Sequence, residues 1–312
     1  MGAWGVGDMP DQEGRSVVVT GANSGLGYVT ARELARRGAR VVLACRSEAR
    51  GKDAVERLRA EVPGAEVELG SLDLGDLASV RAFASALPYE RLDLLVNNAG
   101  VMAMPYGVTA DGFETQFGVN HLGHFALTGL LLPALLAAEG RARGARVVTV
   151  SSMTHLLGTV DLRDLNSERR YRRWVAYGRS KTANLLFTHE LARRLAATGA
   201  DVVAAAAHPG YASTNLQTAG PRAEGRRAAE RIMALGNRVL AQPAEAGALP
   251  ALYAATAPGV CPDSFTGPSV AMWRGAPGRS WRAPWTLDDR VAARLWTASE
   301  ELTGVSYDAL RV

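Results

Sequence analysis

Two residues four positions apart, Tyr177 and Lys181, are the clearest indication of chemistry in this chain of 312 residues. Side chains with this spacing lie on one face of a helix. An ammonium group beside a phenol favours the phenolate and lowers the pKa of the tyrosine, which suits a general acid–base for an alcohol–carbonyl pair. The alternative is a surface helix whose lysine extends into solvent. Because the chain otherwise carries its positive charge as arginine, with Lys52 as the only other lysine, we interpret Tyr177 as a general acid–base.

A glycine-rich stretch, residues 20–27 with the sequence TGANSGLG, lies between a predicted strand and a predicted helix. Glycines there permit a tight turn and let backbone N–H groups approach a pyrophosphate, while the N-terminus of the helix adds partial positive charge. An ordinary glycine-rich turn is the alternative. The position between a strand and a helix favours a turn that binds a dinucleotide.

The end of the second predicted strand, residues 40–45, indicates which dinucleotide would bind. Dinucleotide-binding α/β folds that select NAD place an acidic side chain there to bind the ribose 2′-hydroxyl. This chain has Cys45 in that position, followed by Arg46, with Glu48 as the only carboxylate nearby. A guanidinium can bind a 2′-phosphate through two parallel hydrogen bonds. A solvated loop charge is the alternative, but we predict a preference for NADP(H).

Two hydroxyl residues, Ser151 and Ser152, follow the apolar run at residues 146–150. A hydroxyl at the carboxyl end of a parallel strand faces the crevice where ligands bind. Asn97 begins the sequence NNAG at the end of an earlier predicted strand. A helix cap or a turn would explain either feature when it is taken alone.

These residues need a scaffold of alternating strands and helices, and the sequence shows that alternation. The predicted strands are nearly continuous apolar runs, which is typical of strands buried on both faces of a parallel sheet. They cover residues 16–20, 40–45, 66–69, 93–97, 146–151 and 202–206, with a final strand at 265–270. The predicted helices cover residues 26–37, 48–61, 77–87, 113–138 and 175–198. The pattern predicts an α/β fold, a Rossmann-type doubly wound parallel sheet flanked by helices.

Taken together, the motifs resemble the short-chain dehydrogenase/reductase family over nearly the whole chain. The shared features occur in family order: the glycine-rich turn, NNAG, a Ser after the fifth strand, Y-x-x-x-K, and Pro209-Gly210 with Thr214 close behind. Within the family the chain is most similar to the retinol dehydrogenase and WW-domain oxidoreductase branch. Residues 120–125 (NHLGHF), 177–190 (YGRSKTANLLFTHE), 208–210 (HPG) and 295–305 carry that similarity.

The resemblance implies a role for each matching residue. Tyr177 would transfer the hydroxyl proton, and Lys181 would lower its pKa and hold the nicotinamide ribose. Ser152 would hydrogen-bond the substrate oxygen, and Asn120 would anchor a water in a proton relay. Asp73 would contact the adenine, Asn97 the adenosine side of the cofactor, and Thr214 the carboxamide. The full predicted cofactor set is Gly21, Asn23, Ser24, Gly25, Leu26, Gly27, Arg46, Asp73, Leu74, Asn97, Tyr177, Lys181, Pro209, Gly210 and Thr214.

Outside these motifs we expect an N-terminal arm over residues 1–14 and one domain over 15–312, with a substrate lid at about 212–233 before the last strand. Ser152 and Tyr177 are separated by more than the family's usual spacing. The extra residues, around 159–174, could cover a helix face used for tetramers, which leaves open whether the protein is a monomer or a homo-oligomer. Most of the four tryptophans in the last forty residues should pack the C-terminal segment onto the body.

Composition limits the partners and the compartment. The formal net charge is only +4, and the arginines are scattered, so we predict no nucleic-acid partner. The N-terminus lacks a secretory pattern, and the longest apolar run, residues 125–138, is too short to span a bilayer, so we predict no membrane partner. Two cysteines, Cys45 and Cys261, suit a reduced interior and a cytoplasmic location. The five histidines show no ligand spacing, and we predict no metal.

The sequence therefore predicts an NADP(H)-dependent oxidoreductase that acts on a carbonyl or alcohol in a small apolar substrate. Arginines in the lid leave room for an acidic group on that substrate. Two alternatives remain: a non-catalytic nucleotide sensor or interaction protein on the same fold, and a light-driven enzyme similar to protochlorophyllide reductases.

Overall fold

A single sheet runs through the molecule and sets the position of everything else. The computed structural model describes residues 4–87, 89–138, 144–211 and 242–311. In these ranges eight strands pair in the order β3-β2-β1-β4-β5-β6-β7-β8, all parallel except β8, which is antiparallel to β7. The strands are β1 (Ser16–Thr20), β2 (Arg40–Cys45), β3 (Val67–Ser71), β4 (Leu94–Asn97), β5 (Ala145–Val150), β6 (Val202–Ala207), β7 (Phe265–Val270) and β8 (Arg274–Arg279). The strand order reverses between β1 and β4, and ligands bind at such a reversal in open α/β sheets.

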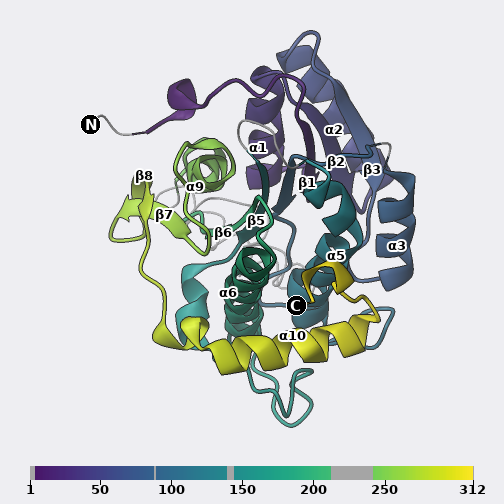
Figure 1. Ribbon diagram of the computed structural model, residues 1–312, viewed down its shortest axis with the longest axis vertical. Coiled ribbons are helices and arrows are strands. Elements are labelled where there is room, and N and C mark those ends of the chain that lie inside the picture. The colour runs from purple at the N-terminus through teal and green to yellow at the C-terminus, as the bar shows by residue number, and fades with distance from the viewer. Residues whose placement is uncertain (1–3, 88, 139–143, 212–241, 312) are drawn as a thin grey trace, which may run out of the picture.

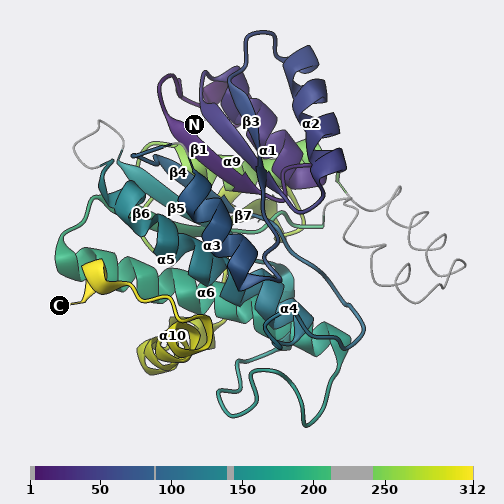
Figure 2. The ribbon, with the colours of Figure 1, turned by 90° about the vertical axis from the view of Figure 1, so that its right-hand side faces the viewer.

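Helices cover both faces of the sheet (Figures 1 and 2). α1, α2 and α9 pack on one face, and α3, α5 and α6 on the other. α10 packs across the outer side of α6, as the two views show together. The helices are α1 (Gly25–Arg36), α2 (Glu48–Glu61), α3 (Leu77–Ala86), α4 (Thr115–Phe117), α5 (Gly123–Leu136), α6 (Arg173–Thr198), α9 (Ala244–Thr256) and α10 (Asp289–Thr303). The predicted α/β doubly wound fold is confirmed.

The core has two halves, one on each face, because successive side chains of a strand point in opposite directions. Val17 and Val19 of β1 pack with α1 and α9, whereas Val18 packs with α5 on the other face. Val147 and Val148 of β5 divide in the same way. Full burial of each such side chain contributes about 1.5–3 kcal/mol, and this two-sided burial explains why the strands read as continuous apolar runs.

The helix predicted over residues 113–138 is interrupted. It consists of α4, a π-helical turn at Gly118–Leu122, and α5. Glycines lie at both ends of the wide turn: a Cβ on Gly118 would come within 2.5 Å of Thr109 Cγ2, and one on Gly123 would overlap the backbone of Leu74. The loops that cross here therefore approach the helix too closely for a larger side chain. π-Helical turns of this kind are frequent at functional sites.

The C-terminal region differs from its prediction in two respects. β7 is not the final strand, since Arg274–Arg279 adds β8 at the edge of the sheet. Its sequence, RGAPGR, has no strand pattern, and an edge position is where a strand tolerates proline. Trp296 is 2% exposed and packs in the core as predicted, and Trp273, which is 39% exposed, stacks on Tyr211 with ring centroids 4.7 Å apart. Trp281 and Trp285 are 57% and 37% exposed and lie outside the core.

The N-terminal arm packs on the body. Trp4 meets Tyr253 of α9 edge to face, with ring centroids 5.3 Å apart. Arg37 donates a 2.7 Å hydrogen bond to the backbone oxygen of Val6, and Met9 is 1% exposed. The arm is thus tied to α1 and α9 by side chains rather than by sheet pairing.

One helical stretch in the described residues, Thr115–Leu136, has the length and apolar composition of a membrane span. It contains α4, the π-helical turn and α5, and 72% of its most apolar window is buried inside the protein. Its apolar residues face the sheet and neighbouring helices in the core. The prediction that the protein has no membrane partner stays a prediction.

Candidate active site

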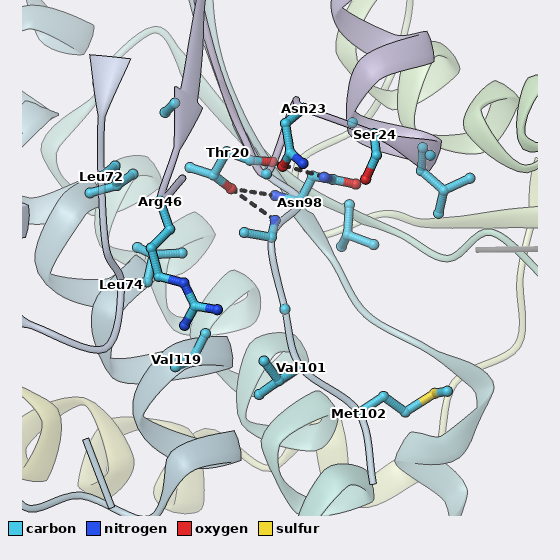
Figure 3. A pocket seen from close by; sticks show the side chains of 18 of the residues that line it. Thr20, Asn23, Ser24, Arg46, Leu72, Leu74, Asn98, Val101, Met102 and Val119 are labelled. Carbon is cyan, nitrogen blue, oxygen red and sulfur yellow. Dashed lines mark hydrogen bonds between the residues drawn. The ribbon is translucent and has the colours of Figure 1, made fainter. Parts of the chain in front are cut away.

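A cavity of about 290 Å³ lies at the carboxyl ends of the central strands, where the strand order reverses. Figure 3 shows the part lined by β1, β2 and β4. The predicted site residues that line this cavity are Gly21, Asn23, Ser24, Gly25, Leu26, Gly27, Arg46, Asp73, Leu74, Ser152, Tyr177, Lys181, Pro209 and Gly210. The tertiary structure thus brings together segments that are up to about 190 positions apart in the chain.

The glycine-rich turn between β1 and α1 depends on backbone conformations and space that other residues would disturb. Gly21 and Gly25 have φ values of +67° and +55°, in the left-handed region that favours glycine. A Cβ on Gly27 would lie 2.5 Å from both the Asn98 side-chain nitrogen and the Gly21 backbone oxygen. The turn therefore leaves a cradle at the N-terminus of α1 that a side chain would fill, and a pyrophosphate fits such a cradle.

The floor of this cradle is held by Thr20 and by the end of β4. Backbone N–H groups of Asn98 and Ala99 each donate a 2.9 Å hydrogen bond to Thr20 Oγ1, and the Asn98 side chain donates to the Thr20 backbone oxygen at 2.8 Å (Figure 3). The Gly-rich turn and the NNAG segment are thereby joined into one surface.

Asn97 does not line the cavity, which corrects its predicted contact with the cofactor. Its side chain is fully buried and donates a 3.0 Å hydrogen bond to Thr128 Oγ1 of α5. Asn98, which sequence reasoning did not single out, lines the cavity in its place. Adjacent side chains at the end of a strand point to opposite sides, so the sequence indicates that one of the two asparagines faces the cavity but not which one.

Arg46 extends from the end of β2 along the cavity (Figure 3). Ser47 and Arg50 line the same side, so two guanidinium groups and a hydroxyl lie where a 2′-substituent on an adenosine ribose would be placed. Cys45 lies beneath them in the core, and burial raises the pKa of its thiol to about 11. Cys45 therefore packs as a neutral side chain, and Arg46 and Arg50 determine the charge of this part of the site.

Tyr177 and Lys181 lie on one face of α6, and both line the cavity. Lys181 Nζ is 5.8 Å from the centre of the Tyr177 ring and donates a 3.0 Å hydrogen bond to the Val150 backbone oxygen. The expected lowering of the Tyr177 pKa is wrong for this structure: burial raises it to about 12, and a hydrogen bond with Ser152 only partly opposes that rise. Burial also lowers the pKa of Lys181 to about 8. Near pH 7 the phenol therefore holds its proton and is ready to donate it.

The two hydroxyls after β5 have different roles. Ser151 Oγ is buried and donates a 2.8 Å hydrogen bond to the Lys181 backbone oxygen, so it fixes α6 against β5. Ser152 lines the cavity beside Tyr177, and its Oγ also accepts a 3.2 Å hydrogen bond from the Thr154 N–H. Both residues border the cavity, but the Ser151 hydroxyl already donates its hydrogen to the Lys181 backbone oxygen.

Asn120 lies in the π-helical turn, behind the cavity wall. Its side-chain nitrogen donates at 2.9 Å both to the Val101 backbone oxygen and to Ser180 Oγ of α6, and its side-chain oxygen accepts from the Val101 N–H at 2.8 Å. These contacts attach the turn to the segment after NNAG and to α6 next to Lys181. The water relay predicted for Asn120 stays a prediction.

The remaining predicted site residues divide between described and undescribed parts of the chain. Pro209 and Gly210 border the cavity after β6, where Gly210 has a φ of +67°. Thr214 and the predicted lid at 212–233 lie outside the described residues. The described ranges contain no group of three His, Cys, Asp or Glu side chains arranged for a metal.

The fold and the cavity define a Rossmann-type site for a nicotinamide dinucleotide beside a buried Tyr–Lys pair. Comparison with known proteins places the chain within this class: residues 15–225 match the family model described as short chain dehydrogenase. The chain is 43% identical to retinol dehydrogenase 12 of Homo sapiens over 95% of this chain and 88% of that protein. It is also 43% identical to polyprenol dehydrogenase of Mus musculus, over 95% and 86% of the two chains. The protein belongs to the short-chain dehydrogenase/reductase family, in the branch that resembles retinol dehydrogenases.

Solved structures support the same assignment. An uncharacterised protein from Mycobacterium paratuberculosis is 46% identical, covers 98% of this chain and 99% of its own, and superposes with a TM-score of 0.81. A Pseudomonas aeruginosa RhlG/NADP complex is 26% identical, with a TM-score of 0.61 over 80% and 92% of the two chains. A Burkholderia phymatum family member solved with NAD has the same identity and TM-score over 79% and 87%. Members of this fold therefore differ in the nucleotide that they carry.

Proposed function

We propose that this oxidoreductase uses NADP(H) and interconverts a carbonyl and an alcohol in an apolar substrate, with Tyr177 as the general acid–base. The observation that carries this proposal is the single cavity that joins the glycine cradle, Arg46 and the Ser152–Tyr177–Lys181 group. When bound there, the nicotinamide ring would supply or accept the hydride. The chain's own residues would bind the dinucleotide, orient the carbonyl and move the proton.

Proton transfer follows from the protonation states of the pair. Because burial keeps the Tyr177 pKa near 12, the phenol can donate its proton to an alkoxide oxygen that forms beside it. Ser152, which lines the same cavity, would donate a hydrogen bond to that oxygen as negative charge builds there. Lys181, whose pKa is lowered to about 8, remains mostly charged at pH 7 and would stabilise the phenolate left behind.

Charge at the end of β2 supports NADP(H) over NAD(H). Arg46 and Arg50 both border the cavity, and the acidic residue that would bind a ribose 2′-hydroxyl is replaced by the buried Cys45. Glu48, the nearest carboxylate in sequence, forms a 2.7 Å ion pair with Lys52 on the exposed face of α2. A 2′-phosphate would therefore find two guanidinium groups at the end of β2, and Asp73 is the carboxylate that borders the same cavity.

Two observations support an apolar substrate. Val101 and Met102 border the same cavity as Tyr177 and Ser152. Retinol and polyprenol, named for the similar proteins from Homo sapiens and Mus musculus, are alcohols with long apolar bodies. The proposal leaves the physiological direction of the reaction to experiment.

The direct test is NADPH oxidation with a panel of carbonyl compounds that includes retinal, steroid ketones and aromatic aldehydes. We expect turnover of at least one apolar member, with NADPH favoured over NADH in kcat/KM. Nucleotide binding without turnover of any member would favour a sensor, and turnover of protochlorophyllide under light alone would favour the pigment-reducing alternative. Either result would overturn the proposal.

A cytoplasmic location is part of the same proposal. Cys45 and Cys261 are both free thiols in the structure, as a reducing compartment requires. Fractionation of the producing cells checks this inference, and recovery in the membrane fraction would contradict it.

A further inference from the structure

His124, at the start of α5, is 1% exposed, yet both of its ring nitrogens have polar partners. Nδ1 lies 3.0 Å from the Asn120 backbone oxygen, and Nε2 lies 2.9 Å from Thr20 Oγ1. Thr20 forms the floor of the glycine cradle, and Asn120 lies in the π-helical turn. One imidazole ring thus connects the nucleotide turn to the turn behind the Tyr–Lys pair.

The partners determine the tautomer of this ring. A backbone carbonyl only accepts hydrogen bonds, so Nδ1 must carry a hydrogen. Burial lowers the pKa of His124 to about 4, and the charge of Lys181 adds to that effect, so the ring is neutral near pH 7. A neutral ring has one N–H, and Nε2 is therefore an acceptor.

Thr20 provides the matching donor. Its hydroxyl already accepts two backbone N–H groups, from Asn98 and Ala99, which occupy both acceptor sites of the oxygen. Its single hydrogen remains, and the His124 Nε2 at 2.9 Å is closer than the other acceptor, the Val96 backbone oxygen at 3.3 Å. The chain of donors therefore runs in one direction, from β4 through Thr20 to His124.

Asn120, which accepts the hydrogen bond from His124 Nδ1 with its backbone oxygen, is itself bonded to α6 through its side chain. Its side chain bonds to Ser180, the neighbour of Lys181 in sequence. A Cβ on Gly100 would lie 3.0 Å from Asn120 Oδ1 and 3.6 Å from Lys181 Nζ, which shows how closely the turn and the lysine approach one point. A shift of the Asn120 turn would therefore move the surroundings of Lys181.

We propose that His124, held as the neutral Nδ1–H tautomer, is a positioning residue that sets the Asn120 turn against the nucleotide-binding turn. The inference rests on the proposed function for its catalytic consequence. Its physical basis is the pair of buried hydrogen bonds at 3.0 and 2.9 Å.

The tautomer can be measured without substrate or nucleotide. The nitrogen shifts of isotope-labelled histidine distinguish Nδ1–H from Nε2–H rings, and His124→Asn identifies the signal. We expect His124 to be Nδ1–H and to remain neutral from pH 8 down to about pH 5, because its pKa is lowered to about 4. An Nε2–H ring, or titration near the ordinary pKa of 6.5, would overturn the proposal even if the enzyme proves active.

The kinetic test compares two buried histidines, one at the start of α5 and one in α6. His124→Asn should lower kcat about 10- to 100-fold, the size of effect that a small misplacement of catalytic groups causes. KM for NADPH should change less than about threefold, since the glycines still shape the cradle. His124→Gln, whose longer amide reaches the Nε2 position, should recover part of kcat, and it also serves if the asparagine variant fails to fold.

The matched control is His189→Asn. His189 is 9% exposed and is also held through both ring nitrogens, by Asp263 Oδ2 at 2.7 Å and Asp289 Oδ1 at 2.8 Å, but it lies outside the Asn120 turn. We expect this variant to lose thermal stability while kcat stays within about threefold of wild type. Equal losses of kcat in both variants, or an unchanged kcat in His124→Asn, would overturn the proposal. Absence of turnover in the wild type would instead reject the proposed function. The measured tautomer of His124 would then still show whether this ring links the Asn120 turn to the nucleotide-binding turn.

Discussion

Two regions hold distant parts of the chain together with different chemistry. One is the nucleotide turn, the glycine-rich turn between β1 and α1, and the other, called here the C-terminal edge, is the contact of His189 with Asp263 and Asp289. At the nucleotide turn the contacts are neutral: Thr20, Asn98 and His124 hydrogen-bond one another or backbone groups. At the C-terminal edge, His189 of α6 contacts Asp263 through Nδ1 at 2.7 Å and Asp289 of α10 through Nε2 at 2.8 Å.

Burial explains the difference. The nucleotide turn is deep in the fold, where an ionised group would lose its hydration, so neutral hydrogen bonds are favoured. The C-terminal edge is closer to solvent, since Asp289 has a 63% exposed side chain, and charges are tolerated there. Substitutions at the nucleotide turn should therefore alter catalysis at every pH. Substitutions at the C-terminal edge should instead alter stability, by an amount that depends on pH and salt.

The largest expected effect is on turnover. Tyr177→Phe removes the proton donor and should lower kcat about 10²- to 10⁴-fold, the usual contribution of a general acid–base. The dissociation constant for NADPH should change little, because the phenyl ring still fills the buried position of Tyr177. Steady-state kinetics and nucleotide titration measure the two quantities, and a variant that retains turnover would remove Tyr177 from the mechanism.

Arg46→Asp should have the next largest effect, on nucleotide preference. Loss of a hydrogen-bonded charge pair costs about 1.5–3 kcal/mol, so the ratio of kcat/KM for NADPH to that for NADH should fall roughly 10- to 100-fold. Arg290→Asp, on the exposed N-terminal turn of α10, makes the same change in net charge and serves as the control. A ratio near one in the wild type would reject the NADP(H) assignment.

Gly27→Ala tests the cradle itself. The new Cβ would lie 2.5 Å from the Asn98 side chain and from the Gly21 backbone oxygen, and overpacking of this kind costs about 1–3 kcal/mol of stability. NADPH binding should weaken as well, because the displaced backbone faces the cavity. Gly7→Ala, with no atom within 4 Å of its added Cβ, should leave both unchanged. Normal NADPH affinity in Gly27→Ala would show that the dinucleotide does not use this turn.

The smallest effect concerns His189 and pH. The two carboxylates raise the pKa of His189 above 6.5, so its contribution to stability is complete below pH 6.5 and is lost as the pH rises through the raised value. The pKa values of Asp263 and Asp289 are lowered from 3.8, so their contribution is lost only as the pH falls below that range. Arg282 and Arg193 complete the charges that face this ring.

Thermal unfolding between pH 6 and about pH 9 checks this expectation. The wild type should lose more stability over that range than His189→Gln, and added salt should reduce the difference because Asp289 is exposed. Turnover at pH 7 should be unchanged in the variant. Parallel pH profiles for the two proteins would show that His189 does not hold α10 through its charge.

Much of the fold could be predicted because each buried strand carries its own pattern. β1 and β2 occupy the predicted residues, and α2 does as well. β8 could not be predicted, since RGAPGR has neither alternation nor β-branched residues and pairs only because β7 offers an open edge. The π-helical turn was equally hidden, because Gly118 and Gly123 at its ends pack closely against Thr109 and Leu74, and these contacts are not visible in the sequence.

By itself, the sequence determined which groups could do chemistry: a phenol and an amine one helical turn apart, glycines before a helix, and an arginine directly after the position where an acidic residue would select NAD. These are local properties of residue type and spacing. Only the tertiary structure decided that Asn98 rather than Asn97 borders the cavity, and that Tyr177 keeps its proton despite Lys181. Both outcomes depend on burial and on strand direction, which arise only when remote segments pack together.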